Sequence, residues 1–197
     1  MSDVIGELAG IAPGSSLDKA RDNRAEAKKH AQTSYDSLFL PKDFGGFSLL
    51  ERCAVAAFVA YLHGRPETSD FYKARLTAAG ASPELQVAVA SEALTAHAHG
   101  PYGHYPTGPL TLEGSDGLIY GVTVSAHHVM GDRLARAFEH VHMLVYHPRD
   151  AKPATLQAML DVGWSTTDVV TLSQLVSFLA FQIRVVAGLK AMQARIK

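Results

Sequence analysis

The pattern of apolar and polar positions predicts a chain that is helical almost throughout. Residues 53–62 are apolar on every side of a helix, which indicates a central, buried helix. The tetrapeptide before this run fits a capping box, with Ser48 as the N-cap and Glu51 at the third helical position. Residues 17–32 favour a helix by propensity, but they hold few apolar positions. We therefore expect a solvated N-terminal helix or arm there.

Serine, proline and glycine mark the next two helices. One helix is expected from Glu67 to Ala79 and is ended by Gly80, which suits a C-terminal cap. Ser82 then supplies an N-cap, followed by proline at the first helical position, and this helix is expected to run to about Ala98.

Proline, glycine and serine also mark the helix boundaries in the last third of the chain. A helix is expected from about Ser125 and is stopped by Pro148, and a short helix follows from Pro153 to Gly163. Residues 165–168 form a second capping box, with aspartate in the acidic position. They begin a long final helix that is expected to end at about Met192.

Residues 97–121 interrupt the helical pattern, because six glycines and three prolines fall in this stretch. A loop this long inside a compact domain is typically a functional cover or an oligomer arm. We call residues 99–124 the inter-repeat loop.

The two halves of the chain resemble each other. RLTAAGASPEL (75–85) and AMLDVGWSTTDV (158–169) each combine a short helix, a glycine, a serine cap and an acidic residue. This likeness suggests an internal duplication. The predicted organisation is an N-terminal arm and connector (1–44), a first repeat (45–98), the inter-repeat loop (99–124) and a second repeat (125–197).

Composition narrows the class of protein. The chain has 197 residues, 47% of them hydrophobic, and a formal net charge of -1 without a basic block, so nucleic acid is not an expected partner. Cys53 is its one cysteine and cannot form an internal disulfide. The N-terminal residues do not have the pattern of a signal peptide, and the longest apolar run, 53–62, is too short to cross a bilayer. A cytoplasmic protein without a membrane partner is expected.

Two segments carry a resemblance to a known superfamily. CAVAAFVAYLHGRPETSDFY (53–72) and LQAMLDVGWSTTDVVTLSQLVSFLAFQIRVVAGL (156–189) resemble the carboxymuconolactone decarboxylase and alkyl hydroperoxidase D-like superfamily, in its peroxidase-related branch with two repeats. The resemblance covers roughly residues 45–98 and 125–192. It implies an all-α, alkyl hydroperoxidase D-like fold with two related helical halves, and a place among the antioxidant oxidoreductases.

The chemical positions of the peroxidase branch are all substituted. A Gly at the end of such a helix leads there into C-x-x-C-x-x-x-H, and these positions hold Arg65, Thr68 and Tyr72 here. The proton-relay glutamate corresponds to Cys53 and the relay histidine to Glu67. Dithiol peroxide reduction needs a reactive thiolate and a second, resolving thiol. We therefore expect this activity to be absent.

Two alternative functions remain open. Decarboxylases of the superfamily lack the thiol pair and need neither metal nor organic cofactor, so a cofactor-free decarboxylase-like or isomerase-like enzyme acting on a small anion through Arg65, Glu67 and Tyr72 is one alternative. A non-catalytic, oligomeric small-molecule binder is the other. Arg65 to Asp70 also fits an ordinary polar helix start, since acids are favoured near a helix N-terminus.

Further candidates lie outside this segment. Arg184 stands in the most apolar helix, where a buried guanidinium would need a partner; it is expected to form an ion pair, a subunit contact or an anion anchor. His140 and His147 are expected to be core or pocket histidines. His99 and His104 lie in the inter-repeat loop, where they could line a ligand site, face solvent or form an oligomer contact.

The last predictions concern metal binding, the role of Trp164 and the oligomeric state. The spacing of the ten histidines does not match a metal motif, so no metal is expected. Trp164 is expected to be a packing wedge. The last helix is apolar on too many sides for a single packing face, which predicts a homo-oligomer.

Overall fold

The computed structural model describes residues 3–196, and this part of the chain folds into nine α-helices and two short 3-10 helices, without a strand. The predicted all-α class is therefore confirmed. The α-helices are α1 (Val4–Ala9), α2 (Ser16–Asp22), α3 (Ala25–Phe39), α4 (Leu49–Leu62), α5 (Pro66–Ala78), α6 (Pro83–Thr95), α7 (Val124–Tyr146), α8 (Pro153–Asp161) and α9 (Thr166–Ile196). The 3-10 helices are η1 (Thr111–Glu113) and η2 (Pro148–Asp150).

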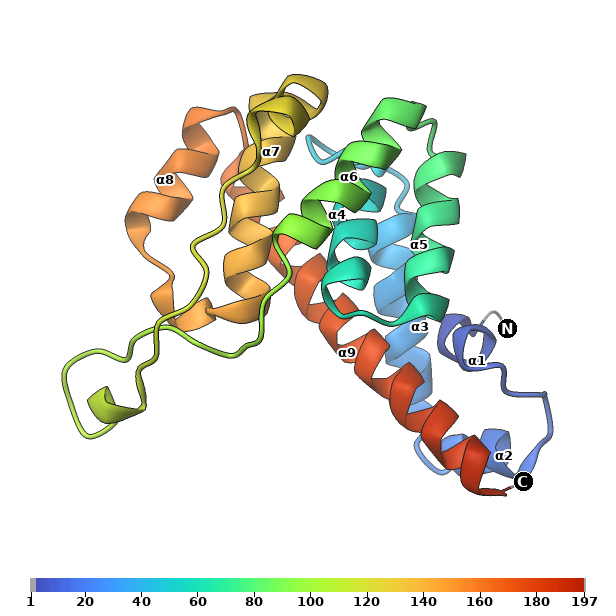
Figure 1. Cartoon of the computed structure of the whole chain (residues 1–197). Helices are drawn as coiled ribbons and strands as arrows, with labels where there is room; N and C mark the ends of the chain where they lie inside the picture. Colours follow the sequence, from blue (N-terminus) through green and yellow to red (C-terminus); the bar gives the residue numbers. More distant parts are fainter. Residues whose placement is uncertain (1–2, 197) are drawn as a thin grey trace.

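Helix α4 is the centre of the fold. It packs against α3, α5, α6, α7 and α9, so neighbours cover it on every side (Figure 1). The residues from Cys53 to Ala60 are each at most 1% exposed. The capping box of Ser48 and Glu51 is formed as predicted, with both of its hydrogen bonds present. The sequence prediction of a central, buried helix is confirmed.

A buried arginine fixes the connector between α3 and α4. Arg52 is 4% exposed, and its guanidinium donates to the backbone carbonyls of Leu38 (2.7 Å), Phe44 (3.0 Å) and Phe47 (2.8 Å). A buried guanidinium needs such partners, because an unsatisfied one would be costly. Arg52 thereby holds the irregular residues 40–48 against the first turn of α4.

A second arginine joins the two halves of the chain. Arg133 in α7 donates to Glu51 (2.7 Å) at the start of α4 and to the carbonyl of Gly163 before α9. Its guanidinium lies 4.1 Å from the ring centre of Trp164, which is 2% exposed and packs edge-on against Phe47. The prediction that Trp164 is a packing wedge is confirmed.

The two segments that resemble each other in sequence form similar turns. Gly80 after α5 and Gly163 after α8 both adopt a left-handed backbone, with φ of 86° and 89°. Glycine adopts this conformation without the steric cost that a β-carbon brings. Ser82 and Ser165 then accept a hydrogen bond from the backbone N–H three residues later. The likeness between residues 75–85 and 158–169 therefore extends from sequence to local backbone.

Two predicted helices are interrupted, and one is shorter than expected. Residues 17–32 form parts of α2 and α3, because the chain turns at Asn23 and Arg24. Helix α7 is broken at Gly131, whose φ of 71° and ψ of 166° lie outside the helical region. Helix α6 ends at Thr95, before the predicted end at Ala98.

Helix α9 crosses the molecule and touches helices from both halves (Figure 1). By length and composition alone, its residues 166–195 could cross a membrane, and half of its most apolar window is buried inside the fold. A buried core helix of a soluble protein passes the same test, so this is weak evidence for a membrane span. The expected cytoplasmic location without a membrane partner stays a prediction.

The inter-repeat loop is irregular apart from η1, as predicted, and its middle projects from the helical body (Figure 1). Its end is fixed by the buried Glu92 of α6, which accepts hydrogen bonds from the hydroxyls of Tyr120 and Thr123, both at 2.5 Å. At its tip Leu112 is 98% exposed. The anchor therefore positions the base of the loop, while the tip contacts solvent.

Removing the guanidinium of Arg52 tests its role in the fold. We expect Arg52→Met to lower the free energy of unfolding by about 3 kcal/mol, because buried carbonyls lose their donors. Urea denaturation followed by circular dichroism measures this change. Arg24→Met, at an exposed arginine, is the matched control and should stay within about 0.5 kcal/mol of the unchanged protein. Equal stability of both variants would contradict the assignment.

Candidate functional site

The structure separates the five positions that the sequence resemblance aligns with a peroxidase site. Cys53, Thr68 and Tyr72 are each at most 1% exposed and belong to the core between α4 and α5. Arg65 is exposed as the N-cap of α5, and Glu67 is partly exposed in its first turn. The positions therefore form a sealed group and a surface group.

The polar groups of the sealed part are hydrogen-bonded inside the protein. The Tyr72 hydroxyl donates to the Gln182 Oε1 of α9 at 2.5 Å, and the Thr68 hydroxyl donates to the Arg65 carbonyl at 2.9 Å. Burial raises the pKa of Tyr72 well above its ordinary value, and the nearby Tyr35 adds to this shift. At neutral pH Tyr72 is therefore a neutral phenol enclosed in the core, without access for a substrate.

Cys53 is a buried thiol. Burial raises its pKa, and the nearby Arg75 only partly opposes the shift. Arg75 itself is held above aromatic rings, 5.5 Å from the ring centres of Tyr35 and Phe39. A buried thiol with a raised pKa is a poor nucleophile. Since the sequence holds one cysteine, a resolving thiol within the same chain is excluded.

The surface part is a cluster of charged side chains around the start of α5. Glu67 pairs with Lys190 of α9 at 3.2 Å. Burial, together with the positive charges of Arg184 and Arg65, lowers the pKa of His63 from 6.5 to about 4. Arg65 and Arg184, which are far apart in sequence, thus lie near the same histidine. We call His63, Arg65, Glu67, Arg184 and Lys190 the α5 charge cluster.

The expectation of a buried Arg184 was wrong. Its side chain is exposed and donates to the Ala180 carbonyl of its own helix at 2.9 Å. The residue lies in an apolar stretch of sequence, but α9 is covered on only part of its circumference. Arg184 falls on the uncovered side, where water solvates the guanidinium.

Three histidines in the second half of α7 and directly after it, His140, His142 and His147, are buried. His140 is 6% exposed, and neither of its ring nitrogens has a hydrogen-bond partner within residues 3–196. His142 is 1% exposed, with Nε2 3.0 Å from the Ala96 carbonyl oxygen and its ring beside Tyr120 and Tyr146. His147 places Nδ1 3.1 Å from a carboxylate oxygen of Asp150. Of the predicted alternatives for His140 and His147, core packing fits the structure.

His99 and His104 of the inter-repeat loop are exposed. His104 lies 3.3 Å from Asp116, which is itself almost fully exposed. Within the single chain they face solvent, and the alternative of an oligomer contact stays a prediction. Across residues 3–196 there is no group of three or more histidine, cysteine or acidic residues that could hold a metal ion.

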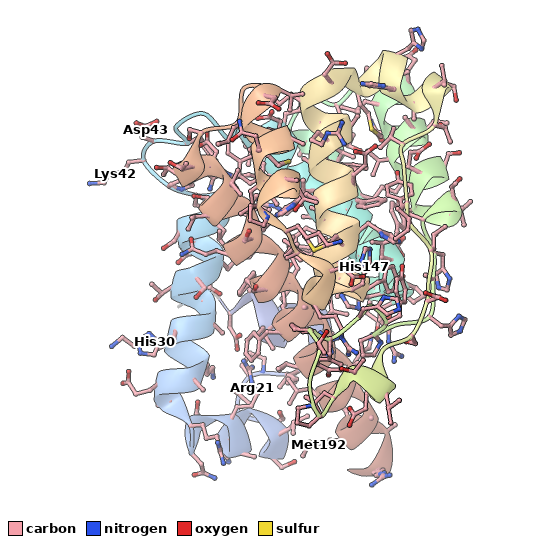
Figure 2. All side chains as sticks on the ribbon, turned by 90° about the vertical axis from the view of Figure 1, so that its left-hand side faces the viewer. Arg21, His30, Lys42, Asp43, His147 and Met192 are labelled. Atoms are coloured by element: carbon pink, nitrogen blue, oxygen red, sulfur yellow. The ribbon has the colours of Figure 1, made fainter. Side chains whose placement is uncertain are left out.

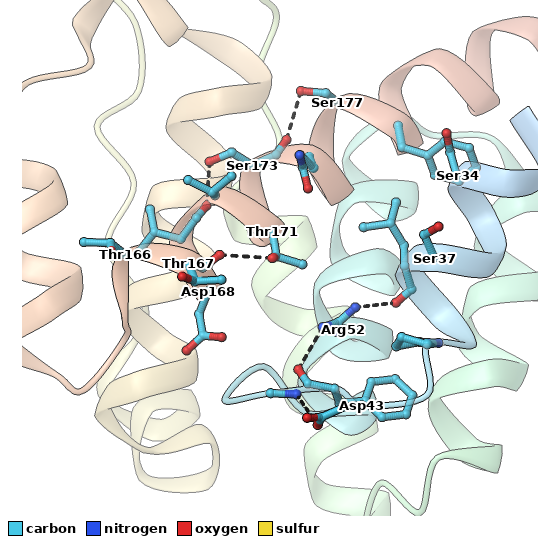
Figure 3. Close-up of a pocket in the computed structure, with 18 of the residues that line it drawn as sticks. Ser34, Ser37, Asp43, Arg52, Thr166, Thr167, Asp168, Thr171, Ser173 and Ser177 are labelled. Carbon is cyan, nitrogen blue, oxygen red and sulfur yellow. Dashed lines mark hydrogen bonds between the residues drawn. The ribbon is translucent and has the colours of Figure 1, made fainter. Parts of the chain in front are cut away.

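A groove that sequence reasoning missed runs along α9. It has a volume of about 1350 Å³ and lies between α3 and the first half of α9, with the connector closing one end (Figure 3). Its wall combines apolar side chains of α8 and α9 with hydroxyl-bearing side chains of α3 and α9. Residues that line it include Thr33, Ser34, Ser37, Asp43, Leu156, Thr167, Val170, Gln174, Ser177, Phe178 and Phe181. None of the predicted site residues lines it. We call this hollow the α3–α9 groove.

A second hollow, among α1, α2 and α3, is explained by ion pairs. Lys28 lies 2.9 Å from Asp18 and 3.0 Å from Asp22, and Arg21 lies 2.6 Å from Asp3 (Figure 2 labels Arg21). Because these side chains pair with opposite charges, this hollow is a structural network that joins α1, α2 and α3.

The buried His142 of α7 gives the protein a predictable response to acid. The pKa of His142 is lowered from 6.5 to about 4 by burial and by the nearby His147. Between these two values the unfolded chain binds a proton that the folded chain does not, so the free energy of unfolding decreases as the pH falls through this window. Each such histidine contributes a slope of at most about 1.4 kcal/mol per pH unit.

His142→Gln keeps a polar side chain but removes the titration. We expect it to flatten the decline in stability between pH 6.5 and 4, measured by urea denaturation at several pH values. His30→Gln, at an exposed histidine of α3 (labelled in Figure 2), is the control and should leave the slope unchanged. An unchanged slope in His142→Gln would show that His142 titrates normally.

Searches of protein-family models, of curated proteins and of solved structures found no match to this chain.

Proposed function

We propose that this chain is a non-catalytic binding and assembly protein on an alkyl hydroperoxidase D-like helical body, without dithiol peroxidase activity. The observation that carries the proposal is the enclosure of Cys53, Thr68 and Tyr72, which are at most 1% exposed. Peroxide chemistry at a thiol requires an accessible thiolate and a second sulfur. The resemblance in sequence supports the helical body, and the burial of these side chains supports the loss of the reaction.

The α3–α9 groove is the surface that supports binding. Binding sites are concave and mostly apolar, with a few polar groups that fix orientation. The groove combines apolar residues such as Phe178 and Phe181 with hydroxyl groups from α3 and α9. Phe181 remains 47% exposed and Val170 57% exposed, so apolar surface is available to an occupant.

The absence of dithiol turnover is directly measurable. We expect hydrogen peroxide and an organic hydroperoxide to be consumed no faster with this protein and a dithiol reductant than with the reductant alone. Cys53→Ala should behave identically, because the buried thiol takes no part. Peroxide consumption that depends on the protein and disappears in Cys53→Ala would refute the proposal.

The α5 charge cluster favours a second candidate, a cofactor-free acid/base enzyme or receptor for a small anion. Its support is the proximity of Arg65 and Arg184 to His63, together with Lys190 beside Glu67. Such a group of cations at a helix N-terminus suits a carboxylate or phosphate. Tyr72, which the sequence placed in the same site, is enclosed and cannot take part. The cluster therefore supports anion binding better than proton transfer.

Substitution of Arg65 separates the two candidates. If the cluster binds small carboxylates, Arg65→Ala should weaken that binding about 10-fold, as loss of a charge-assisted hydrogen bond does. Titration followed by NMR chemical shifts of the α5 amides would measure it. Arg24→Ala is the control, since Arg24 is an exposed arginine at the start of α3. Equal effects of both variants would leave only the binding and assembly proposal.

A further inference from the structure

The exposed side of α9 carries a regular stripe. Residues separated alternately by three and four positions are all exposed along the helix: Thr167, Val170, Gln174, Ser177, Phe181, Arg184 and Gly188. This spacing keeps residues on one face and is the spacing of a seam between two packed helices. Most of the side chains are small or uncharged, so another helix can approach closely.

The stripe lacks charge over most of its length. No charged residue occurs in residues 169–183, between Asp168 and Arg184. The facing wall of the α3–α9 groove presents the hydroxyl residues Thr33, Ser34 and Ser37 (Figure 3). Depletion of charge together with an exposed aromatic residue distinguishes the core of protein interfaces from ordinary surface.

Charges are placed at the two ends of this neutral stretch. Arg184 lies at one end and donates only to a carbonyl of its own helix. Asp43 lies at the other end, in the connector that closes the groove (Figures 2 and 3), and it lines the groove together with Thr167. Its carboxylate accepts a hydrogen bond from the Gly45 N–H at 2.9 Å, and within residues 3–196 it has no cation at ion-pairing distance.

We propose that the occupant of the α3–α9 groove is α9 of a second copy of this chain, packed antiparallel in a two-fold symmetric dimer. With the symmetry axis between Gln174 and Ser177, Phe181 packs against Val170 of the partner subunit. The same register brings Arg184 opposite Thr167 of the partner subunit, within reach of the partner's Asp43. Symmetry then forms every contact twice, as an isologous interface requires.

Charge selects the antiparallel arrangement. A parallel pair would place Arg184 beside Arg184 of the partner subunit, and the two acidic ends would also meet. The antiparallel pair places a cation at each acidic end. The inference takes the groove as a binding surface from the proposed function, and it does not depend on the fate of the thiol chemistry.

Sedimentation equilibrium of the full chain tests the dimer. The unchanged protein should show a reversible monomer–dimer equilibrium. Phe181→Glu should raise the dimer dissociation constant about 100-fold, because it places a charge in the neutral seam. Arg24→Glu, on an exposed arginine outside the groove, should leave it unchanged. Circular dichroism confirms that each variant is folded.

Charge reversal tests the register. Arg184→Glu and Asp43→Arg should each raise the dissociation constant about 10-fold, because like charges then meet at both ends. An equimolar mixture of the two single variants should recover the dimer, since in the mixed pair both ends again join opposite charges. An ion pair within one chain would not be restored by mixing.

The dimer measurements and the peroxide assay test different claims, so either can fail without the other. A chain that stays monomeric at all concentrations, or a dimer that neither Phe181→Glu nor the charge reversals weaken, would overturn the antiparallel dimer. Recovery of the dimer in a double variant that carries both Arg184→Glu and Asp43→Arg, but not in the mixture of single variants, would also overturn it. Peroxide turnover is measured independently, so it bears on the proposed function alone.

Discussion

Burial of α4 on every face is the constraint on which the other elements depend. The residues from Cys53 to Ala60 present no polar side chain to water, so helices must cover all sides of α4. Its neighbours come from both halves of the chain and from the N-terminal arm. Arg52 and the capping box hold its start in place, because the buried carbonyls of the connector need donors.

This constraint also determines where the positions aligned by the sequence resemblance with a peroxidase site lie. Thr68 and Tyr72 are four residues apart on α5, so they share one face, and both are fully buried. Gln182 of α9 closes the group through its hydrogen bond with Tyr72. A reaction at these positions would require a channel through tightly packed helices. The residues that the sequence resemblance aligns with thiols and relay groups are therefore parts of the core or of the polar start of α5.

Covering α4 leaves α9 with an uncovered side. One face of α9 packs on the helices around α4, while the opposite face carries Val170, Phe181 and small polar residues into the α3–α9 groove. The backbone polar groups of such an apolar helix are hydrogen-bonded within the helix. Its exposed apolar side chains are removed from water only when a partner covers them. The proposed dimer satisfies this need and gives the charges at the two ends of the groove a common role.

The sequence by itself determined the helical class, the central position of residues 53–62, the serine caps and the glycine turns after α5 and α8. These features depend on local periodicity and backbone conformation, which neighbouring residues encode. It also determined that a dithiol pair is absent, because the chain has one cysteine.

Only the tertiary structure decided which side of each helix meets water. Arg184 looked buried because its neighbours in sequence are apolar, yet it lies on the open side of α9. The three carbonyl partners of Arg52, the hydrogen bond between Tyr72 and Gln182, and the groove itself join segments far apart in the chain. Local patterns carry no information about such contacts, since they arise only when the helices pack together.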